Sequence, residues 1–131
     1  MNKFKAKRIN TPDGIFDSIG EYKYWLQLNT LKSDVSADRQ IINIERQVVY
    51  KFIINKILIG KYIADFVITY SDATLEVHDF KNPYLLGKGK STSAGAMFQY
   101  KKKLMLALYN IEVKTITNEN TKNRKSKSKR D

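Results

Sequence analysis

Two aspartates and a lysine interrupt apolar segments of the chain in which charged side chains are unusual. Residues 62–70 read YIADFVITY and residues 76–81 read EVHDFK, and the turn-like SDAT follows the first of them. Both segments are rich in β-branched and aromatic residues, so they predict adjacent strands. Because side chains alternate across a strand, Asp79 and Lys81 share one face, and Asp65 lies on the neighbouring strand.

These three residue types at this spacing predict a metal site. Two carboxylates that lie close together repel each other and lose hydration, which is costly unless a cation or a proton compensates. Lys81 supplies one positive charge, and a bound divalent cation would supply the rest. Ligation by Asp65, Asp79 and water offers only oxygen, which suits Mg²⁺ and also Mn²⁺. A structural Asp–Lys ion pair beside a second aspartate is the alternative interpretation.

The elements that must position these residues are predicted in the order α, β, β, β, α, β. The helices cover residues 17–32 and 94–109, and the strands cover residues 42–54, 57–70, 74–80 and 111–117, with a turn at Asn55 and Lys56. The second helix forms a crossover, which favours parallel pairing of the last strand with the third. The predicted fold class is α/β, with a mixed central sheet and helices on both faces.

Each predicted helix has an apolar side that should face the core. In the first helix, which Ser18 can cap, this side consists of Ile19, Tyr22, Trp25, Leu26 and Leu28. In the second helix it consists of Met97, Phe98, Leu104 and Leu108. Glu45 and Gln47 share one face of the first strand, from which they could approach the two aspartates.

The order of elements and the charged residues together resemble a known family. Asp65 in ADF, followed by Asp79, Phe80 and Lys81 on the next strand, is similar to the signature of the PD-(D/E)XK nucleases. The resemblance covers roughly residues 15–117 and is nearest to small phage-encoded RecB-like nucleases and resolvases of four-way (Holliday) DNA junctions. Ala64 stands where the family usually has proline. The resemblance implies an αβββαβ restriction-endonuclease-like core.

The resemblance also implies roles for individual residues. Asp65 and Asp79 would bind Mg²⁺, and the backbone carbonyl of Phe80 would complete their ligation. Glu21 on the first helix matches the helical glutamate that many members use as a further ligand. Lys81 would position and polarise the attacking water, so that Glu21, Asp65, Asp79 and Lys81 form the catalytic set.

Glu21, and the pair formed by His78 and Glu76, each have competing interpretations. Ser18 and Glu21 have the spacing of a capping box, in which the glutamate reaches back to the amide of the N-cap residue. Glu21 is therefore either a metal ligand or a helix cap. His78 and Glu76 could form another site, but they lie on the opposite strand face from Asp79, where a lone histidine is usually a packing or surface residue.

The positive charge is concentrated at the two ends of the chain. The net charge is +11, of which residues 1–8 carry +4 and residues 122–131 carry +5, so the remaining 113 residues carry only +2. The predicted organisation is a basic N-terminal arm at residues 1–14, a nuclease-like domain at residues 15–117 and a disordered basic tail at residues 118–131. Such arms suit phosphate backbones, although the tail could simply increase solubility.

Several lysines are candidates for contact with DNA. Lys88 and Lys90 lie in a loop rich in glycine, lysine and serine, directly after Lys81. Lys101, Lys102 and Lys103 follow one another on the second helix, and we expect Lys102 or Lys103 to face the catalytic edge. A solvated helix face is the alternative. In the tail, the candidates are Lys125, Lys127, Lys129 and Arg130.

Other features of the composition limit the class of protein. The absence of cysteine excludes disulfides and thiolate zinc sites. No apolar run approaches the roughly 20 residues of a membrane span, and the basic N-terminus lacks the apolar region of a secretory signal. We therefore expect no membrane partner and a cytoplasmic location, which would be the bacterial host cytoplasm if the protein is phage-encoded.

The sequence therefore predicts a Mg²⁺-dependent endodeoxyribonuclease selective for branched DNA. Its partner would be DNA, and cutting both strands of a junction would favour a homodimer. Two alternatives remain open at this point: a non-catalytic DNA-binding or packaging accessory protein that keeps the fold, and a transposase-like subunit that cleaves DNA ends.

Overall fold

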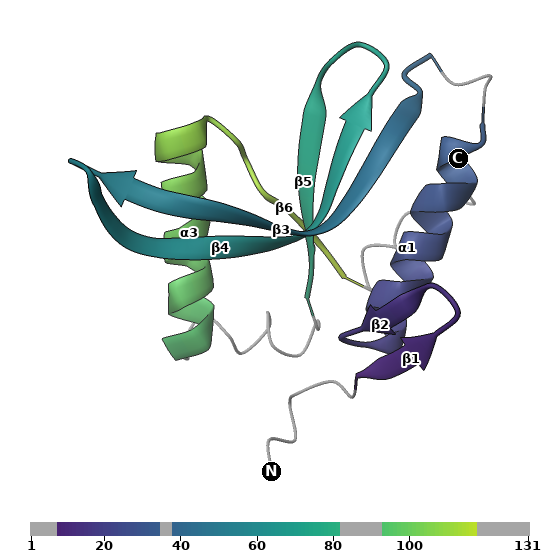
Figure 1. Cartoon of the computed structure of the whole chain (residues 1–131), viewed down its shortest axis with the longest axis horizontal. Helices are drawn as coiled ribbons and strands as arrows, with labels where there is room; N and C mark the ends of the chain where they lie inside the picture. The colour runs from purple at the N-terminus through teal and green to yellow at the C-terminus, as the bar shows by residue number, and fades with distance from the viewer. Residues whose placement is uncertain (1–7, 35–37, 82–92, 118–131) are drawn as a thin grey trace, which may run out of the picture.

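The computed structural model describes residues 8–34, 38–81 and 93–117 (Figure 1). Its elements follow the predicted order αβββαβ, preceded by a short hairpin that we did not predict. The hairpin consists of β1 (Ile9–Thr11) and β2 (Gly14–Phe16). It is followed by α1 (Ile19–Lys32), β3 (Ile41–Ile54), β4 (Ile57–Tyr70), β5 (Leu75–Phe80), α3 (Ser93–Tyr109) and β6 (Lys114–Ile116).

The central sheet is mixed, as the helical crossover predicted. Its strand order is β3-β4-β5-β6, in which β3, β4 and β5 pair antiparallel and β6 pairs parallel to β5. Asn55 and Lys56 form the predicted turn between β3 and β4, with φ of 54° and 67°. These positive φ values match a tight two-residue hairpin turn. The end of the long β3–β4 hairpin that carries this turn extends past α3 (Figure 1).

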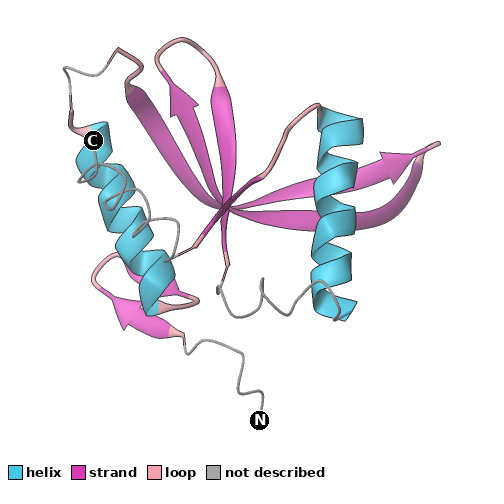
Figure 2. Cartoon of the chain, turned by 180° about the vertical axis from the view of Figure 1, so that it is seen from behind, coloured by secondary structure: helices cyan, strands magenta, loops and turns pink. Residues whose placement is uncertain are grey.

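The two helices pack on opposite faces of the sheet. In β4, Phe66 and Ile68 belong to a cluster that includes α1, whereas Val67 between them belongs to a cluster that includes α3. Successive side chains of a strand point to opposite faces, so the helices cover different sides (Figure 2). The buried members are Tyr24, Leu28, Ile41, Phe66, Ile68 and Ile116 in the α1 cluster, and Phe52, Tyr62, Ala64, Val67, Val77, Phe98, Met105 and Val113 in the α3 cluster.

The buried side of α1 differs from the predicted one. Tyr24 and Leu28 face the sheet, while Ile19 and Leu26, which we placed in the core, are 57% and 42% exposed. The rings of Tyr22 and Trp25 instead pack against Phe16 of the N-terminal hairpin, with centroid distances of 4.8 and 5.7 Å. The apolar residues of α1 thus cover two different partners, and the prediction considered only the sheet.

The buried side of α3 also differs from the predicted one. Phe98 and Met105 face the core at 8% and 0% exposure, whereas Met97 is 53% exposed and Leu108 is 38% exposed. The helix ends at Tyr109, and the next residue, Asn110, has a φ of 57°, which does not continue a helix. In the part of the chain that the structure describes, no helix is long and apolar enough to cross a membrane.

The N-terminal hairpin lies partly within the segment that we predicted to be a basic arm. Phe16 is fully buried, and the guanidinium carbon of Arg46 lies 3.5 Å from its ring centroid. Arg46 also donates a hydrogen bond to the carbonyl of Ile15 at 2.9 Å. These contacts hold β2 against β3 and place the start of α1. The first seven residues and the predicted tail at 118–131 lie outside the described residues.

Candidate metal centre

Asp65 lies where the alternation of β4 shifts by one residue. Tyr62 and Ala64 face the α3 cluster, but Phe66 faces the α1 cluster, so these even-numbered positions do not all share one face. Opposite this point, Gln47 of β3 has a φ of 54°. A residue in this left-handed conformation distorts a strand locally. Strict alternation would place Ile63, Asp65 and Val67 on one face. Val67 instead belongs to the same cluster as Tyr62 and Ala64, so that predicted grouping is wrong.

Asp65 connects three strands through its two oxygens. Its Oδ2 accepts a hydrogen bond of 2.8 Å from the backbone N–H of Phe80 in β5, and its Oδ1 accepts one of 3.4 Å from Nε2 of Gln47 in β3. The side chain is 9% exposed. Gln47 thus approaches the aspartate as we expected, whereas Glu45 is exposed on β3.

Asp79 and Lys81 form an ion pair at the end of β5. Asp79 is 2% exposed, and its Oδ2 lies 3.1 Å from Nζ of Lys81 with an angle that does not make a hydrogen bond. The ammonium of Lys81 also lies 4.3 Å from the ring centroid of Phe98 in α3. The Lys81 backbone N–H donates to the carbonyl of Ile116 at 2.8 Å, which anchors the lysine beside β6.

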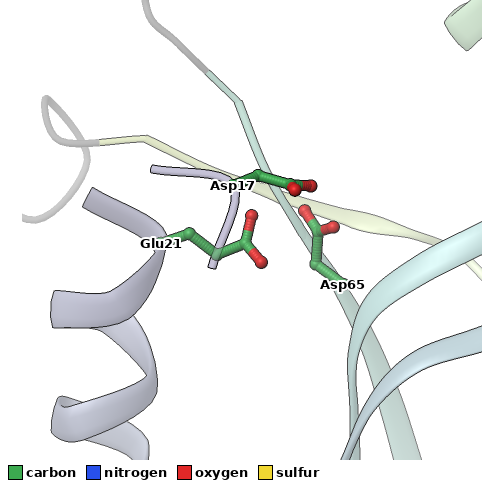
Figure 3. A group of neighbouring side chains, drawn as sticks. All are labelled: Asp17, Glu21 and Asp65. Carbon is green, nitrogen blue, oxygen red and sulfur yellow. The ribbon is translucent and has the colours of Figure 1, made fainter. Parts of the chain in front are cut away.

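Glu21 and Asp17 bring two further carboxylates to Asp65. Oxygens of Asp17, Glu21 and Asp65 all lie within 4.8 Å of one another (Figure 3). Glu21 belongs to the first turn of α1, and Asp17 precedes the N-cap residue Ser18. We did not predict Asp17 as a site residue. An acid just before a helix is common in any case, because it interacts favourably with the helix dipole.

The cap of α1 leaves the Glu21 carboxylate free for another role. Ser18 Oγ accepts the backbone N–H of Glu21 at 3.0 Å, which is one half of a capping box. The Glu21 side chain is 3% exposed, and its Oε2 has no hydrogen-bond partner among the described residues. The backbone of Glu21 therefore serves the cap, while its carboxylate points toward Asp65.

Burial raises the pKa of these carboxyl groups. The pKa of Glu21 rises from 4.5 to about 7, mainly because of burial and then because of Asp17, with Arg46 acting in the opposite direction. Burial also raises the pKa of Asp65, and the charges of Asp79 and Glu21 raise it further. Carboxyl groups with raised pKa values gain from a nearby cation, since it removes both the repulsion and the loss of hydration.

A cavity of about 470 Å³ opens next to these groups. Asp17, Asp65, Asp79 and Lys81 line it, together with Lys61 of β4 and Lys101 of α3. Tyr62 also lines the cavity at 4% exposure; its hydroxyl has no hydrogen-bond partner among the described residues, and burial raises its pKa, so it stays neutral. The cavity is therefore lined by both carboxylates and lysines.

The lysines of α3 are arranged differently from our prediction. Lys101, rather than Lys102 or Lys103, lines the cavity. Lys102 Nζ lies 3.5 Å from Oγ1 of Thr115 and 5.5 Å from the ring centroid of Phe98, and Lys103 is exposed. Successive helical residues are about 100° apart, so only one of the three can point into the cavity. The candidates Lys88, Lys90, Lys125, Lys127, Lys129 and Arg130 lie outside the described residues.

His78 and Glu76 lie on the other face of β5, as predicted. His78 is buried, with Nδ1 2.6 Å from the hydroxyl of Tyr24 and Nε2 2.9 Å from Oε1 of Glu76. Glu76 also pairs with Arg39 and Lys114 at 3.0 and 2.9 Å. This network ties α1 to the sheet. It lies on the opposite face of β5 from Asp79.

These described residues define a mixed α/β protein with buried carboxylates beside a lysine-lined cavity. The chain belongs to the family described as Protein of unknown function (DUF1064), whose model matches residues 1–122. Comparison with curated proteins and with solved structures found no match.

Proposed function

We propose that the protein is a Mg²⁺-dependent endodeoxyribonuclease with a restriction-endonuclease-like core. The observation that carries this proposal is the burial of Asp65 and Asp79 on adjacent strands, with Lys81 paired to Asp79 at the edge of the cavity. A protein that only bound DNA would gain nothing from two buried acids, because burying a charge is costly. The resemblance to PD-(D/E)XK nucleases gives these residues a role that requires their burial.

The carboxylates fit a hard divalent cation. Asp65, Asp79 and Glu21 offer only oxygen, as would the carbonyl of Phe80. No described residue donates a hydrogen bond to Glu21 Oε2. The raised pKa values of Glu21 and Asp65 indicate that nearby positive charge does not compensate for their burial and for the neighbouring acids. When bound, Mg²⁺ would stabilise charge on the phosphate and lower the pKa of a water molecule.

Lys81 would act next to this cation. Its ammonium is fixed between Asp79 and the ring of Phe98, and its side chain is 27% exposed at the cavity. From there it can orient the attacking water and stabilise the negative charge that develops on the phosphate. Asp79 in turn would hold the ammonium directed toward the reacting group.

DNA would approach the cavity through its lysines. Lys61 and Lys101 border the opening, where each can contact a phosphate of the backbone. The body of the chain is nearly neutral, so we propose recognition of branched DNA structure rather than of base sequence. Lys102, Lys103 and the lysines of the loop and tail would extend the same phosphate contacts.

Cleavage of a set of labelled substrates tests this proposal. A four-way junction, a flap and a linear duplex of the same sequence should be compared with Mg²⁺ and with chelator. We expect Mg²⁺-dependent cleavage, fastest on the branched substrates. Binding without cleavage of any substrate would favour the DNA-binding accessory protein, and cleavage confined to duplex ends would favour a transposase-like subunit.

The C-terminal tail should contribute to binding but not to catalysis. Deleting residues 122–131 lowers the net charge from +11 to +6. Each phosphate contact that is lost should reduce the slope of log K against log salt concentration by about 0.9 on duplex DNA. Affinity should fall by a similar factor for every DNA, while turnover at saturating DNA stays unchanged. An unchanged salt slope would show that the tail only increases solubility.

We also propose that the β3–β4 hairpin carries the contact between two copies of the chain. Exposed apolar residues lie on both of its strands, namely Val49, Ile53, Ile54, Ile57, Leu58, Ile59 and Ile63. Over the two faces of the hairpin together they expose on the order of 600 Å², compared with the roughly 800 Å² that each partner buries in a standard interface. On the outer side β3 is an edge strand, and an antiparallel edge can pair with its own copy.

The oligomeric state tests this surface. Ile57→Lys combined with Leu58→Lys should convert a dimer to a monomer in light scattering, while Ile42→Lys, an exposed position near the other end of β3, should not. Lys51 and Lys61 form a cross-strand pair within the surface, so salt should strengthen association by screening their charges, the opposite of its effect on DNA binding. A monomeric wild-type chain at all salt concentrations would contradict the proposal.

A further inference from the structure

Three carboxylates converge beside the ion pair of Asp79 with Lys81. Asp17 comes from the connection between β2 and α1, Glu21 from the first turn of α1, and Asp65 from β4. Figure 3 shows the three side chains gathered around a common space. Their oxygens lie within 4.8 Å of one another. Three acids from separate elements would repel one another without a compensating charge.

Glu21 supplies a second, independent observation at this point. Its side chain is 3% exposed, its carboxylate is directed toward Asp65, and its Oε2 has no hydrogen-bond partner among the described residues. Buried polar atoms are nearly always hydrogen-bonded, so an unpartnered carboxylate oxygen indicates a missing ligand.

The protein itself offers little positive charge to fill this space. Arg46 and Lys81 both act electrostatically on Glu21. However, the guanidinium of Arg46 is engaged by the carbonyl of Ile15 and the ring of Phe16, and the ammonium of Lys81 is paired with Asp79. Arg8 pairs with Asp17 at 3.4 Å, and both side chains are mostly exposed, at 75% and 55%. A surface pair of this kind contributes little and is easily exchanged for a stronger partner.

The spacing of the oxygens suits one divalent cation. Opposite oxygen ligands lie about 4 Å apart around Mg²⁺ and up to about 5 Å apart around a larger ion such as Ca²⁺. The three carboxylates therefore need only a small adjustment to share an ion. The exposed side of Asp17 leaves room for the water molecules that Mg²⁺ retains.

We propose that Asp17 joins Glu21 and Asp65 as a ligand of a second divalent cation, either Mg²⁺ or Mn²⁺, at a second position. Asp65 would be shared between this position and the one formed with Asp79 and the Phe80 carbonyl. The pairing of two positions rests on the proposed function, but the position at Asp17 is carried by its own three carboxylates. Asp17 thereby becomes a metal ligand that the nuclease signature does not contain.

Binding of Mn²⁺ without DNA tests the second position. Titration followed by electron paramagnetic resonance and calorimetry should give two bound ions for the wild-type chain. Asp17→Asn should retain one ion and bind the other at least about 10- to 100-fold more weakly, the range found even for indirect disturbance of a metal site. Asp38→Asn is a matched control, because Asp38 is exposed in the connection between α1 and β3.

The outcomes separate this proposal from the proposed function. A wild-type chain that binds a single Mn²⁺ would overturn the second position, and so would an Asp17→Asn chain that binds both ions as tightly as the wild type. Circular dichroism of the variant should be unchanged, because Asp17 is exposed. A chain that binds two Mn²⁺ but cleaves no DNA would contradict the nuclease proposal alone.

Discussion

The Asp65→Asn chain should be inactive and, in the absence of metal, more stable than the wild type. The substitution removes a ligand that the proposed cation needs and leaves a side chain of the same shape. A bound metal contributes several kcal/mol of transition-state stabilisation, and about 1.4 kcal/mol is a factor of ten, so cleavage should fall at least about 10³-fold. DNA binding should be retained or become tighter, because less negative charge faces the phosphates.

The gain in stability follows from the raised pKa of Asp65. In the unfolded chain the carboxyl has an ordinary pKa near 3.8, while burial and neighbouring acids raise its pKa in the folded chain. The folded state therefore binds more protons above pH 4, and the free energy of unfolding falls as the pH rises toward the folded pKa. Thermal unfolding in chelator should show this decline for the wild type and a flatter profile for Asp65→Asn.

A matched substitution controls for the change of residue type. Asp38→Asn alters an exposed aspartate outside the site and should change neither cleavage nor the pH profile of unfolding. Asp79→Asn should lose cleavage as Asp65→Asn does. Wild-type rates in either site variant would show that the metal site has been placed on the wrong residues.

Glu21→Gln should separate the two roles that the sequence left open for this residue. If Glu21 is a metal ligand, the rate should fall by about 10²-fold or more while the fold is kept. The N-cap itself should survive, because Ser18 Oγ accepts the backbone N–H of residue 21, which the substitution does not alter. A residue that acts only in the cap should tolerate glutamine with little loss of rate.

The stability of the Glu21→Gln chain should rise, whereas its cleavage rate should fall. The pKa of Glu21 is about 7 when folded and 4.5 in its ordinary state, so ionisation costs the folded chain stability as the pH rises from about 4.5 to about 7. The shift corresponds to roughly 3 kcal/mol above that range. In chelator at pH 8 the variant should therefore melt several degrees higher than the wild type, and at pH 4 the two should melt together. A less stable but fully active variant would instead identify Glu21 as a cap.

Regular elements with strong local signals could be predicted from the sequence. The apolar segments that carry Asp65 and Asp79, the turn at Asn55 and Lys56, and the parallel pairing of β6 all agree with the structure, because each depends on local chemistry or on a crossover rule. The separation of His78 from Asp79 also agrees, since it needs only the alternation of one strand.

Features that depend on contacts between distant segments could not be predicted. The hairpin β1–β2 has strands of three residues, too short for a periodic signal, although TPDG at residues 11–14 is a recognisable turn. Because this hairpin was missed, the burial of Tyr22 and Trp25 against Phe16 was missed as well. The position of Asp17 depends on the same contacts, which bring the start of α1 to β4.

The shift in β4 is a further example of a tertiary effect. Strict alternation would place Asp65 on the same face as Ile63 and Val67. The left-handed conformation of Gln47, which lies opposite Asp65 on β3, distorts the two strands at this point. Nothing in the type of Gln47 favours this conformation, which is more typical of glycine or asparagine. The sequence could thus name Asp65 as a candidate, but it could not orient its carboxylate.

The most direct test of the central claim is the dependence of cleavage on Mg²⁺ at saturating enzyme. Wild type and Asp79→Asn, purified in the same way, should be incubated with one labelled four-way junction over a range of Mg²⁺ concentrations and with chelator. The account predicts cleavage that rises with Mg²⁺ and saturates for the wild type, none in chelator, and none above background for Asp79→Asn. Equal cleavage by both proteins, or a wild type that cuts as fast in chelator as in Mg²⁺, would contradict it.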